Sequence, residues 1–141
     1  MKIPTIALMY DFDGTLSPAN MQEYDFMKAI GIKEKDSFWN EVYALAKSQN
    51  ASSILSYMKH MIDRAKAGGL SIKRQQFVEF GKGIELFPGV EEWFTLINEE
   101  GKRMGVNVEH YIISSGLKEL IEGTSIAKYF KQIYACSFMY E

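Results

Sequence analysis

The sequence predicts an α/β fold in which a parallel sheet of three strands carries a block of helices inserted after the first strand. Apolar runs typical of strands, at residues 6–10, 110–113 and 132–138, alternate with helical patterns, which is the order that gives a parallel sheet. Between residues 20 and 80 the periodicity is helical throughout. The first strand ends in Asp11-Phe12-Asp13-Gly14-Thr15, and ligands of open α/β sheets bind at the carboxyl ends of the strands.

Local signals define the individual elements. Residues 6–10 are continuously apolar, as expected of a strand that is buried on both faces of a parallel sheet. A helix is predicted from Asn20, with Glu23 at its third position, to Gly31. Further helices are expected to begin at capping residues, namely Asp36, Ser52 or Ser53, and Ser71. After Phe87-Pro88-Gly89 the helical stripe resumes from Val90 to Gly101, and a short helix follows from Leu117 to Glu122.

Composition excludes several classes of protein. The 141 residues, 47% of them hydrophobic, suit one domain or one domain with an insertion. A net charge of −2 provides no basic surplus for nucleic acid or an anionic membrane. Cys136 is the single cysteine, so an intrachain disulfide and a thiolate zinc cluster are excluded. Because no signal peptide and no apolar run of roughly 20 residues is seen, we expect a cytoplasmic protein.

Asp11 and Asp13 stand one residue apart at the end of a strand. Two carboxylates this close repel each other unless a cation or a shared proton relieves them. An Asp-Gly turn without function is one interpretation. An EF-hand fails, because the sixth residue of such a loop would be Leu16 and the twelfth Gln22. In the functional interpretation Asp11 attacks phosphorus and becomes an aspartyl-phosphate, Asp13 serves as acid and base, and Mg²⁺ bridges carboxylate and phosphate.

A second polar group, Ser114-Ser115-Gly116, follows the strand predicted at residues 110–113. Its hydroxyls could simply cap the helix that comes next. The same arrangement can bind phosphate, since free amides at a helix start face an anion. The Gly-x-Ser-x-Gly elbow of esterases is not met, because residue 112 is Ile, so Ser114 is not expected to be a nucleophile.

These two motifs together resemble the signatures of the haloacid dehalogenase-like (HAD) hydrolases. The first is the strand ending in Asp11-Phe12-Asp13-Gly14-Thr15-Leu16, and the second is Tyr111-Ile112-Ile113-Ser114-Ser115-Gly116. With helices between the two motifs, the chain is most similar to the phosphoserine-phosphatase-like branch with a helical cap. The resemblance implies a Rossmann-like parallel sheet, incomplete here, formed by residues 1–16 and 85–141. Residues 17–84 would then be the cap, rich in Trp39, Tyr43, Tyr57 and Phe77.

The resemblance also implies roles for individual residues of a Mg²⁺-dependent phosphatase of small phosphomonoesters. Asp11 matches the nucleophile and a metal ligand. Asp13 matches the acid/base residue, and its backbone carbonyl matches another metal ligand. Thr15 matches the residue whose hydroxyl helps to hold the loop and belongs with the phosphate-binding set. Ser114 matches the phosphate-binding hydroxyl, with Ser115 and Gly116 completing that motif.

The sequence departs from the family pattern in its later part. The family needs a lysine after the third strand and acidic residues after the fourth, but the chain stops at Glu141, and Lys118, Lys128 and Lys131 come too early. Asn20 stands where the phosphoserine enzymes have a glutamate, which argues against phosphoserine as substrate. We therefore expect the 141-residue chain alone to be inactive, as a truncated form, a fragment or a half-enzyme completed by a partner.

Two other functions stay open on the sequence alone. One is a non-catalytic binding or regulatory module that keeps the strand-end loops. The other is a phosphotransferase or phosphomutase of the same fold, which would pass the phosphoryl group to an alcohol. In the family topology one edge of the first strand would be left unpaired here, and an apolar edge favours self-association.

Overall fold

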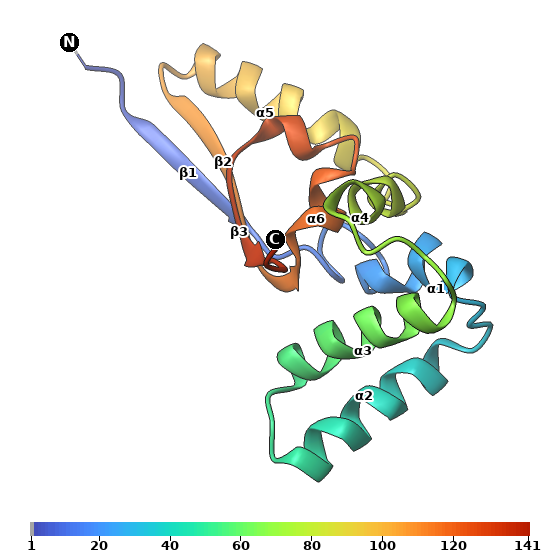
Figure 1. Cartoon of the computed structure of the whole chain (residues 1–141). Coiled ribbons are helices and arrows are strands. Elements are labelled where there is room, and N and C mark those ends of the chain that lie inside the picture. Colours follow the sequence, from blue (N-terminus) through green and yellow to red (C-terminus); the bar gives the residue numbers. More distant parts are fainter. Residues whose placement is uncertain (1) are drawn as a thin grey trace.

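The computed structural model describes residues 2–141 and contains a parallel sheet with strand order β1–β2–β3 (Figure 1). The strands are β1 (Thr5–Tyr10), β2 (Asn107–Leu117) and β3 (Phe130–Cys136). The predicted α/β fold with a partial, three-stranded parallel sheet is therefore confirmed. Helices separate the strands in the chain, as parallel connections require.

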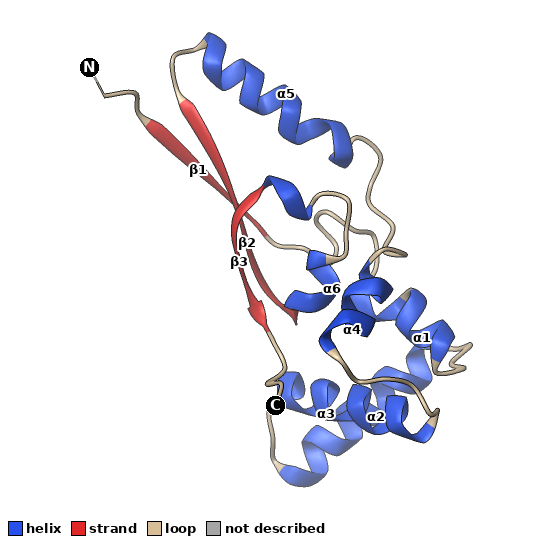
Figure 2. Ribbon diagram, turned by 45° about the horizontal axis from the view of Figure 1, so that its top comes forward, coloured by secondary structure: helices blue, strands red, loops and turns tan. Residues whose placement is uncertain are grey.

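The helices fall into two groups around the sheet. Between β1 and β2 the chain forms a short 3-10 helix and five α-helices, and between β2 and β3 it forms α6 and a second 3-10 turn. Their bounds are Met21–Glu23 (3-10), α1 Asp25–Ala29, α2 Lys35–Gln49, α3 Ser53–Ala67, α4 Arg74–Gly81, α5 Val90–Arg103, α6 Lys118–Glu122 and Ala127–Tyr129 (3-10). Figures 1 and 2 show α5 and α6 along one face of the sheet, and α2 and α3 beyond the carboxyl ends of the strands.

The strand β1 is less buried than predicted. It pairs only with β2 and forms the edge of the sheet, and no helix lies across the second face in Figure 2. As a result Ile6 is 47% and Met9 59% exposed, so the prediction of burial on both faces is wrong. Met9 lies on the open face together with Ile113 and Tyr134, which are paired in register and are also exposed, whereas Ile6 points to the opposite face and is exposed at the edge of the sheet. The open edge agrees with the sequence prediction, and self-association through it stays a prediction.

The helix predicted from Asn20 to Gly31 is broken into two pieces. The 3-10 helix Met21–Glu23 ends at Tyr24, whose φ of −89° and ψ of −123° are not helical, and α1 begins only after it. The predicted pairing at the start does form, since the Asn20 N–H donates to Glu23 Oε2 at 3.2 Å. Contacts from outside the segment compete with a continuous helix, because the Tyr24 hydroxyl donates to Ser17 Oγ at 3.0 Å.

The two chain crossings between the sheet and residues 17–84 lie side by side. Ser17 is fully buried, and its hydroxyl donates to the Glu85 carbonyl at 2.6 Å. One residue earlier, the Leu16 carbonyl accepts from the Phe87 N–H at 2.9 Å. The outgoing and the returning segments are thus joined to each other by hydrogen bonds at the place where the helical insert begins and ends.

Within the insert, α4 is bound closely to α6 of the sheet layer, whereas α2 and α3 pack mainly against each other. Two glycines allow this close approach. A Cβ on Gly81 would overlap the Leu120 carbonyl oxygen, and a Cβ on Gly123 would overlap the Val78 carbonyl oxygen. The two helices therefore meet backbone to backbone, and only glycine fits at the crossing.

A series of side-chain hydrogen bonds joins β1, β2 and α5 just before Asp11. The Trp93 Nε1–H donates to Tyr10 Oη at 2.9 Å, and Tyr10 Oη lies 2.9 Å from Nδ1 of His110. His110 is only 2% exposed, and its Nε2 lies 2.7 Å from Asn98 Oδ1. Because Asn98 Oδ1 can only accept, Nε2–H donates to it and Tyr10 donates to Nδ1. Burial lowers the pKa of His110, and these hydrogen bonds require its neutral imidazole.

We expect His110 to lower the free energy of unfolding as the pH drops below about 6.5, the ordinary pKa of histidine. With the pKa of His110 lowered in the folded state, the unfolded chain binds more protons in this range. Asp13, whose pKa is raised to about 6, contributes with the opposite sign between its ordinary pKa and that value. Urea unfolding at pH 7.5 and 5.5 of the wild type and of His110→Gln isolates the histidine contribution. Equal pH dependence in His110→Gln and wild type would contradict the expectation.

Candidate active site

The loop after β1 is a tight turn built around Phe12. The Phe12 side chain is fully buried, while its carbonyl accepts from the amides of Thr15, Leu16 and Ser17 at 3.1, 2.9 and 3.2 Å. Gly14 has a φ of 76°, a conformation that favours glycine. With Phe12 anchored in the core, the carboxylates on either side of it are left outside the core at the carboxyl end of the sheet.

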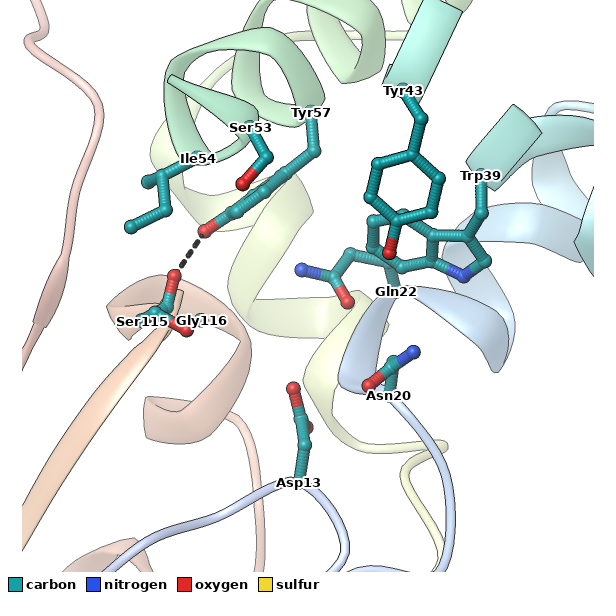
Figure 3. A pocket seen from close by; sticks show the side chains of 10 residues that line it. All are labelled: Asp13, Asn20, Gln22, Trp39, Tyr43, Ser53, Ile54, Tyr57, Ser115 and Gly116. Atoms are coloured by element: carbon teal, nitrogen blue, oxygen red, sulfur yellow. Dashed lines mark hydrogen bonds between the residues drawn. The ribbon is translucent and has the colours of Figure 1, made fainter. Parts of the chain in front are cut away.

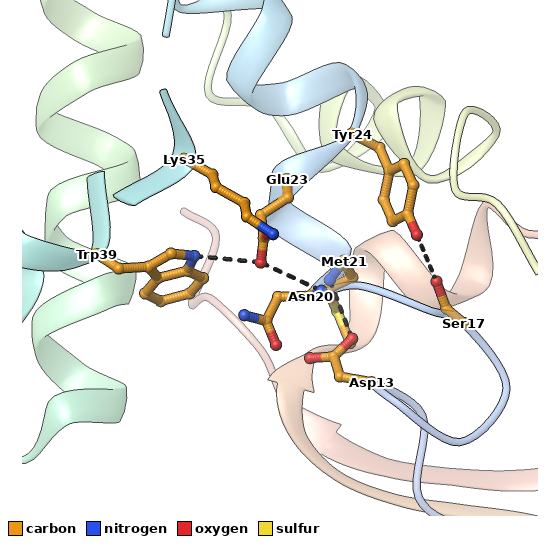
Figure 4. Close-up of polar contacts among 8 residues, drawn as sticks. All are labelled: Asp13, Ser17, Asn20, Met21, Glu23, Tyr24, Lys35 and Trp39. Atoms are coloured by element: carbon orange, nitrogen blue, oxygen red, sulfur yellow. Dashed lines mark hydrogen bonds and ion pairs between the residues drawn. The ribbon is translucent and has the colours of Figure 1, made fainter. Parts of the chain in front are cut away.

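Asp13 is the half-buried member of the carboxylate pair. Its Oδ1 accepts from the Met21 N–H at 2.9 Å, which fixes the side chain against the 3-10 helix (Figure 4). The pKa of Asp13 is raised to about 6, mainly by burial; the Met21 hydrogen bond opposes this rise, and the nearby charges of Asp11 and Glu23 add to it. Asp11, by contrast, is exposed.

The Ser114–Gly116 motif lies within β2 rather than after it, so the predicted strand end at Ile113 is wrong. Ile113 pairs with Tyr134 and Leu117 with Cys136. The two residues of β2 are four positions apart, whereas their partners on β3 are only two positions apart. The two extra residues bulge out of the ladder, a distortion common beside active sites. Inside the bulge the Gly116 N–H donates to Ser114 Oγ at 2.9 Å, which leaves the hydroxyl proton of Ser114 free to donate.

Gly116 is required by the close approach of Met21. A Cβ at this position would overlap the Met21 methyl group and would lie 2.7 Å from its sulfur. The next amide, that of Leu117, lies 3.1 Å from the same sulfur. The bulge of β2 is therefore packed directly on the 3-10 helix that holds Asp13, and this contact brings the two sequence motifs together.

A cavity of about 170 Å³ opens between these loops and the helices of the insert (Figure 3). Its residues come from two sides. The first loop, the 3-10 helix and β2 contribute Asp13, Asn20, Gln22, Ser115 and Gly116. The helices α2 and α3 contribute Trp39, Tyr43, Ser53, Ile54 and Tyr57.

Three polar contacts hold α2 and α3 over the cavity. The Tyr57 hydroxyl donates to the Ser115 carbonyl at 2.8 Å, which ties α3 to the bulge of β2. The Trp39 Nε1–H donates to Glu23 Oε2 at 3.2 Å, and the Lys35 ammonium lies 3.5 Å from Glu23 Oε1, which ties α2 to the 3-10 helix (Figure 4). Burial is the main cause that raises the pKa of Tyr57, so its hydroxyl stays protonated as a donor.

The structure brings together half of the site residues that the sequence predicts. Asp13, Ser115 and Gly116 line the cavity. Asp11 and Thr15 are exposed on the loop beside it, and Ser114 is half-buried in the bulge.

The helical insert contributes more to the cavity than the motifs suggest. Trp39, Tyr43 and Tyr57 lie at the cavity as expected of cap aromatics, whereas Phe77 is buried against Phe26 in the core. Gln22 and Ser53 also line the cavity, and neither is predicted as a site residue from the sequence. The one sequence signal near Gln22 is the helix-capping residue Asn20, which precedes it by two positions.

The residues that could hold a cation are few. Among residues 2–141, no group of three or more His, Cys, Asp or Glu side chains is arranged to bind a metal ion. Asp11 and Asp13 offer hard oxygen donors, and Mg²⁺ commonly binds through one or two carboxylates with water and substrate phosphate completing its shell. The donor chemistry therefore fits Mg²⁺, provided that further oxygens come from outside this pair.

Comparison with known proteins adds one relative. No protein-family model matches the chain. The chain is 33% identical over 144 residues to an uncharacterized protein of Borreliella burgdorferi, in a match that covers 95% of this chain and 50% of that protein. The chain thus spans about half the length of the curated relative that it matches. Within the described residues, no helix combines the length and the apolar character needed to cross a membrane.

Proposed function

We propose that this chain carries part of the active site of a Mg²⁺-dependent phosphatase of small phosphomonoesters, which works through an aspartyl-phosphate as HAD hydrolases do. The observation that carries the proposal is the position of the two motifs. Asp11 and Asp13 follow β1, the Ser114–Gly116 bulge ends β2, and Asp13, Ser115 and Gly116 border one cavity. A phosphate ester at this edge would meet a nucleophile and hydroxyl donors together.

The proposed reaction of the two carboxylates has two steps. In the first, an Asp11 oxygen forms a bond to phosphorus while the bond from phosphorus to the ester oxygen breaks, and Asp13 gives its proton to the departing oxygen. In the second, Asp13 takes a proton from a water molecule that attacks the phosphorus, and Asp11 leaves as a carboxylate with release of phosphate. Mg²⁺ would reduce the repulsion between the carboxylates and the phosphate oxygens.

The contacts of the other residues suit this chemistry. The Met21 N–H orients Asp13, and the free hydroxyl proton of Ser114 can donate to a phosphate oxygen. The aromatic side chains of α2 and α3 cover the cavity and limit the access of water. Small phosphate esters as substrates also suit the cytoplasmic location that the sequence predicts.

The test is phosphate release from an aryl phosphate, measured for the 141-residue chain and for the complete gene product. We expect the complete product to release phosphate with Mg²⁺ and to lose this activity in EDTA, because the metal offsets the charge repulsion. The 141-residue chain alone should show little turnover. A complete product that binds phosphate esters but never hydrolyses them would contradict the phosphatase and support a binding module. Transfer to an added alcohol in place of water would indicate a phosphotransferase.

A further inference from the structure

Gln22 has an unusual position at the proposed active site. It is only 2% exposed, yet its side-chain Oε1 has no hydrogen-bond partner among the described residues. A buried amide oxygen without a donor destabilises the free protein, so such an atom in a native fold needs an explanation. Gln22 lines the cavity, and Figure 3 shows its amide directed into the space between Tyr57, Tyr43 and Asn20.

The other buried side-chain atoms without a partner do not share this position. Glu119 Oε2 is one of them, but the residue lies on α6, where its other oxygen accepts from the Ser137 hydroxyl, and it does not line the cavity. His60 Nε2 lies 2.7 Å from Glu41 Oε2 between α3 and α2. Gln22 is therefore the one of these three residues that lines the cavity of the proposed site.

The charge and the walls of the cavity restrict what the Gln22 oxygen can bind. Asp13 is the one charged side chain among the described residues that line the cavity, so a second negative group on a ligand would be repelled. The ring of Trp39 lies 6.2 Å from that of Tyr57 and 6.3 Å from that of Tyr43, and aromatic faces attract cationic and polar hydrogen-bearing groups. These walls suit a neutral or a positively charged group on the organic part of the ligand.

The size of the cavity restricts the ligand further. Its volume of about 170 Å³ is below the ~300 Å³ at which pockets for drug-sized ligands begin. A phosphate at the carboxylate end would leave space for an organic part of only a few atoms. The donor that meets Gln22 must therefore be close to the phosphate in the ligand.

From these observations we propose that the cavity selects small phosphomonoesters whose organic part carries a hydroxyl or ammonium donor and no negative charge, with Gln22 Oε1 accepting from that donor. Gln22 is then a specificity-determining residue. The proposal rests on the proposed function for the placement of the phosphate, and it adds the class of substrate that the site prefers.

The experiment measures binding rather than turnover. Four esters are titrated into the 141-residue chain and followed by calorimetry, namely ethyl phosphate, glycerol phosphate, ethanolamine phosphate and phosphoglycolate. We expect glycerol phosphate and ethanolamine phosphate to bind about tenfold more tightly than ethyl phosphate, the effect of one hydrogen bond to a buried acceptor. Phosphoglycolate should bind more weakly than ethyl phosphate. The order of affinity of glycerol phosphate and ethanolamine phosphate distinguishes a hydroxyl from an ammonium as the preferred donor.

The matched variants are Gln22→Met and Gln75→Met. Methionine at position 22 keeps a similar shape and removes the acceptor. The roughly tenfold preference for the two donor-bearing esters over ethyl phosphate should therefore disappear, and the melting temperature of the free protein should rise. Gln75 lies exposed on α4 and bonds Glu79, so Gln75→Met should keep both the preference and the melting temperature.

Several outcomes would overturn the proposal. These are a preference for phosphoglycolate, equal binding of all four esters, binding of none of them, or an unchanged preference in Gln22→Met. A lower melting temperature of Gln22→Met would also count against it, because a destabilised variant indicates that the amide is bonded within the protein. If the complete gene product never hydrolyses the esters but the preference is observed, the phosphatase fails and this inference stands. Hydrolysis without the preference refutes this inference alone.

Discussion

Replacement of Gly123 by alanine is expected to destabilise the protein by at least about 3 kcal/mol. The new Cβ would overlap the Val78 carbonyl oxygen and would lie 2.9 Å from the Cα of Gly81. Both neighbours belong to the backbone of α4, so no side chain can turn away to make room. The clash can be relieved only by separating α4 from α6, which would open the core between the insert and the sheet layer. Urea unfolding of wild type and variant measures the loss.

Gly68→Ala is the matched control for this substitution. Gly68 follows α3 with an ordinary negative φ, and its nearest neighbour to a new Cβ is the Arg64 carbonyl oxygen at 3.4 Å. The change in its free energy of unfolding should stay within about 0.5 kcal/mol. Equal stabilities of Gly123→Ala and Gly68→Ala would contradict the backbone contact between α4 and α6.

Exchange of the two loop carboxylates for amides should separate their roles in the proposed reaction. Asp11→Asn should lower turnover of the complete gene product by about 10⁴-fold or more on any ester, because the attacking oxygen is lost. Asp13→Asn should lower it by roughly 10²- to 10⁴-fold on an alkyl phosphate, whose departing oxygen needs a proton. On an aryl phosphate the loss in Asp13→Asn should be smaller, since a phenolate departs without protonation. The ratio of the two rates, measured for each variant, provides the readout.

The control for both exchanges is Asp36→Asn, a change at an exposed residue in the first turn of α2. It should leave both rates unchanged. Beryllium fluoride, which mimics a phosphoryl group on a carboxylate, should bind at Asp11 in the Asp13→Asn variant and fail to bind in Asp11→Asn. An adduct on any other residue, or turnover that survives Asp11→Asn, would refute the assigned nucleophile.

The type of most helices and strands could be predicted from the sequence, whereas their burial and pairing in the fold could not. The β1 strand and the helices were predictable because periodicity and capping residues are local signals. The exposure of Ile6 and Met9 was not, because it depends on which strands and helices are neighbours in space. The bulge that holds Ser114 is likewise set by the pairing of β2 with β3, which no property of the serines themselves encodes.

Some residues of the candidate site could likewise be predicted from the sequence, and others could not. Asp11, Asp13 and Ser114 could be singled out because their residue types follow apolar runs of the sequence at spacings suited to phosphate chemistry. Gln22 could not, because what distinguishes it is an unpaired atom in a cavity, and an unpaired atom is a property of the folded protein. The contact between Tyr57 and Ser115 spans 58 positions in the chain and has no sequence pattern of its own.

The segments Leu16–Ser17 and Glu85–Phe87 are hydrogen-bonded to each other, so the helical insert leaves and rejoins the sheet layer at one place. Since the two ends of the insert are fastened to each other, a different set of helices could be grafted between the 3-10 helix and Glu85. The 3-10 helix itself has to be kept, because its Met21 N–H holds Asp13. The helices over the cavity could in this way be exchanged as one unit, provided that the new set places a glycine against Gly123 where it crosses α6.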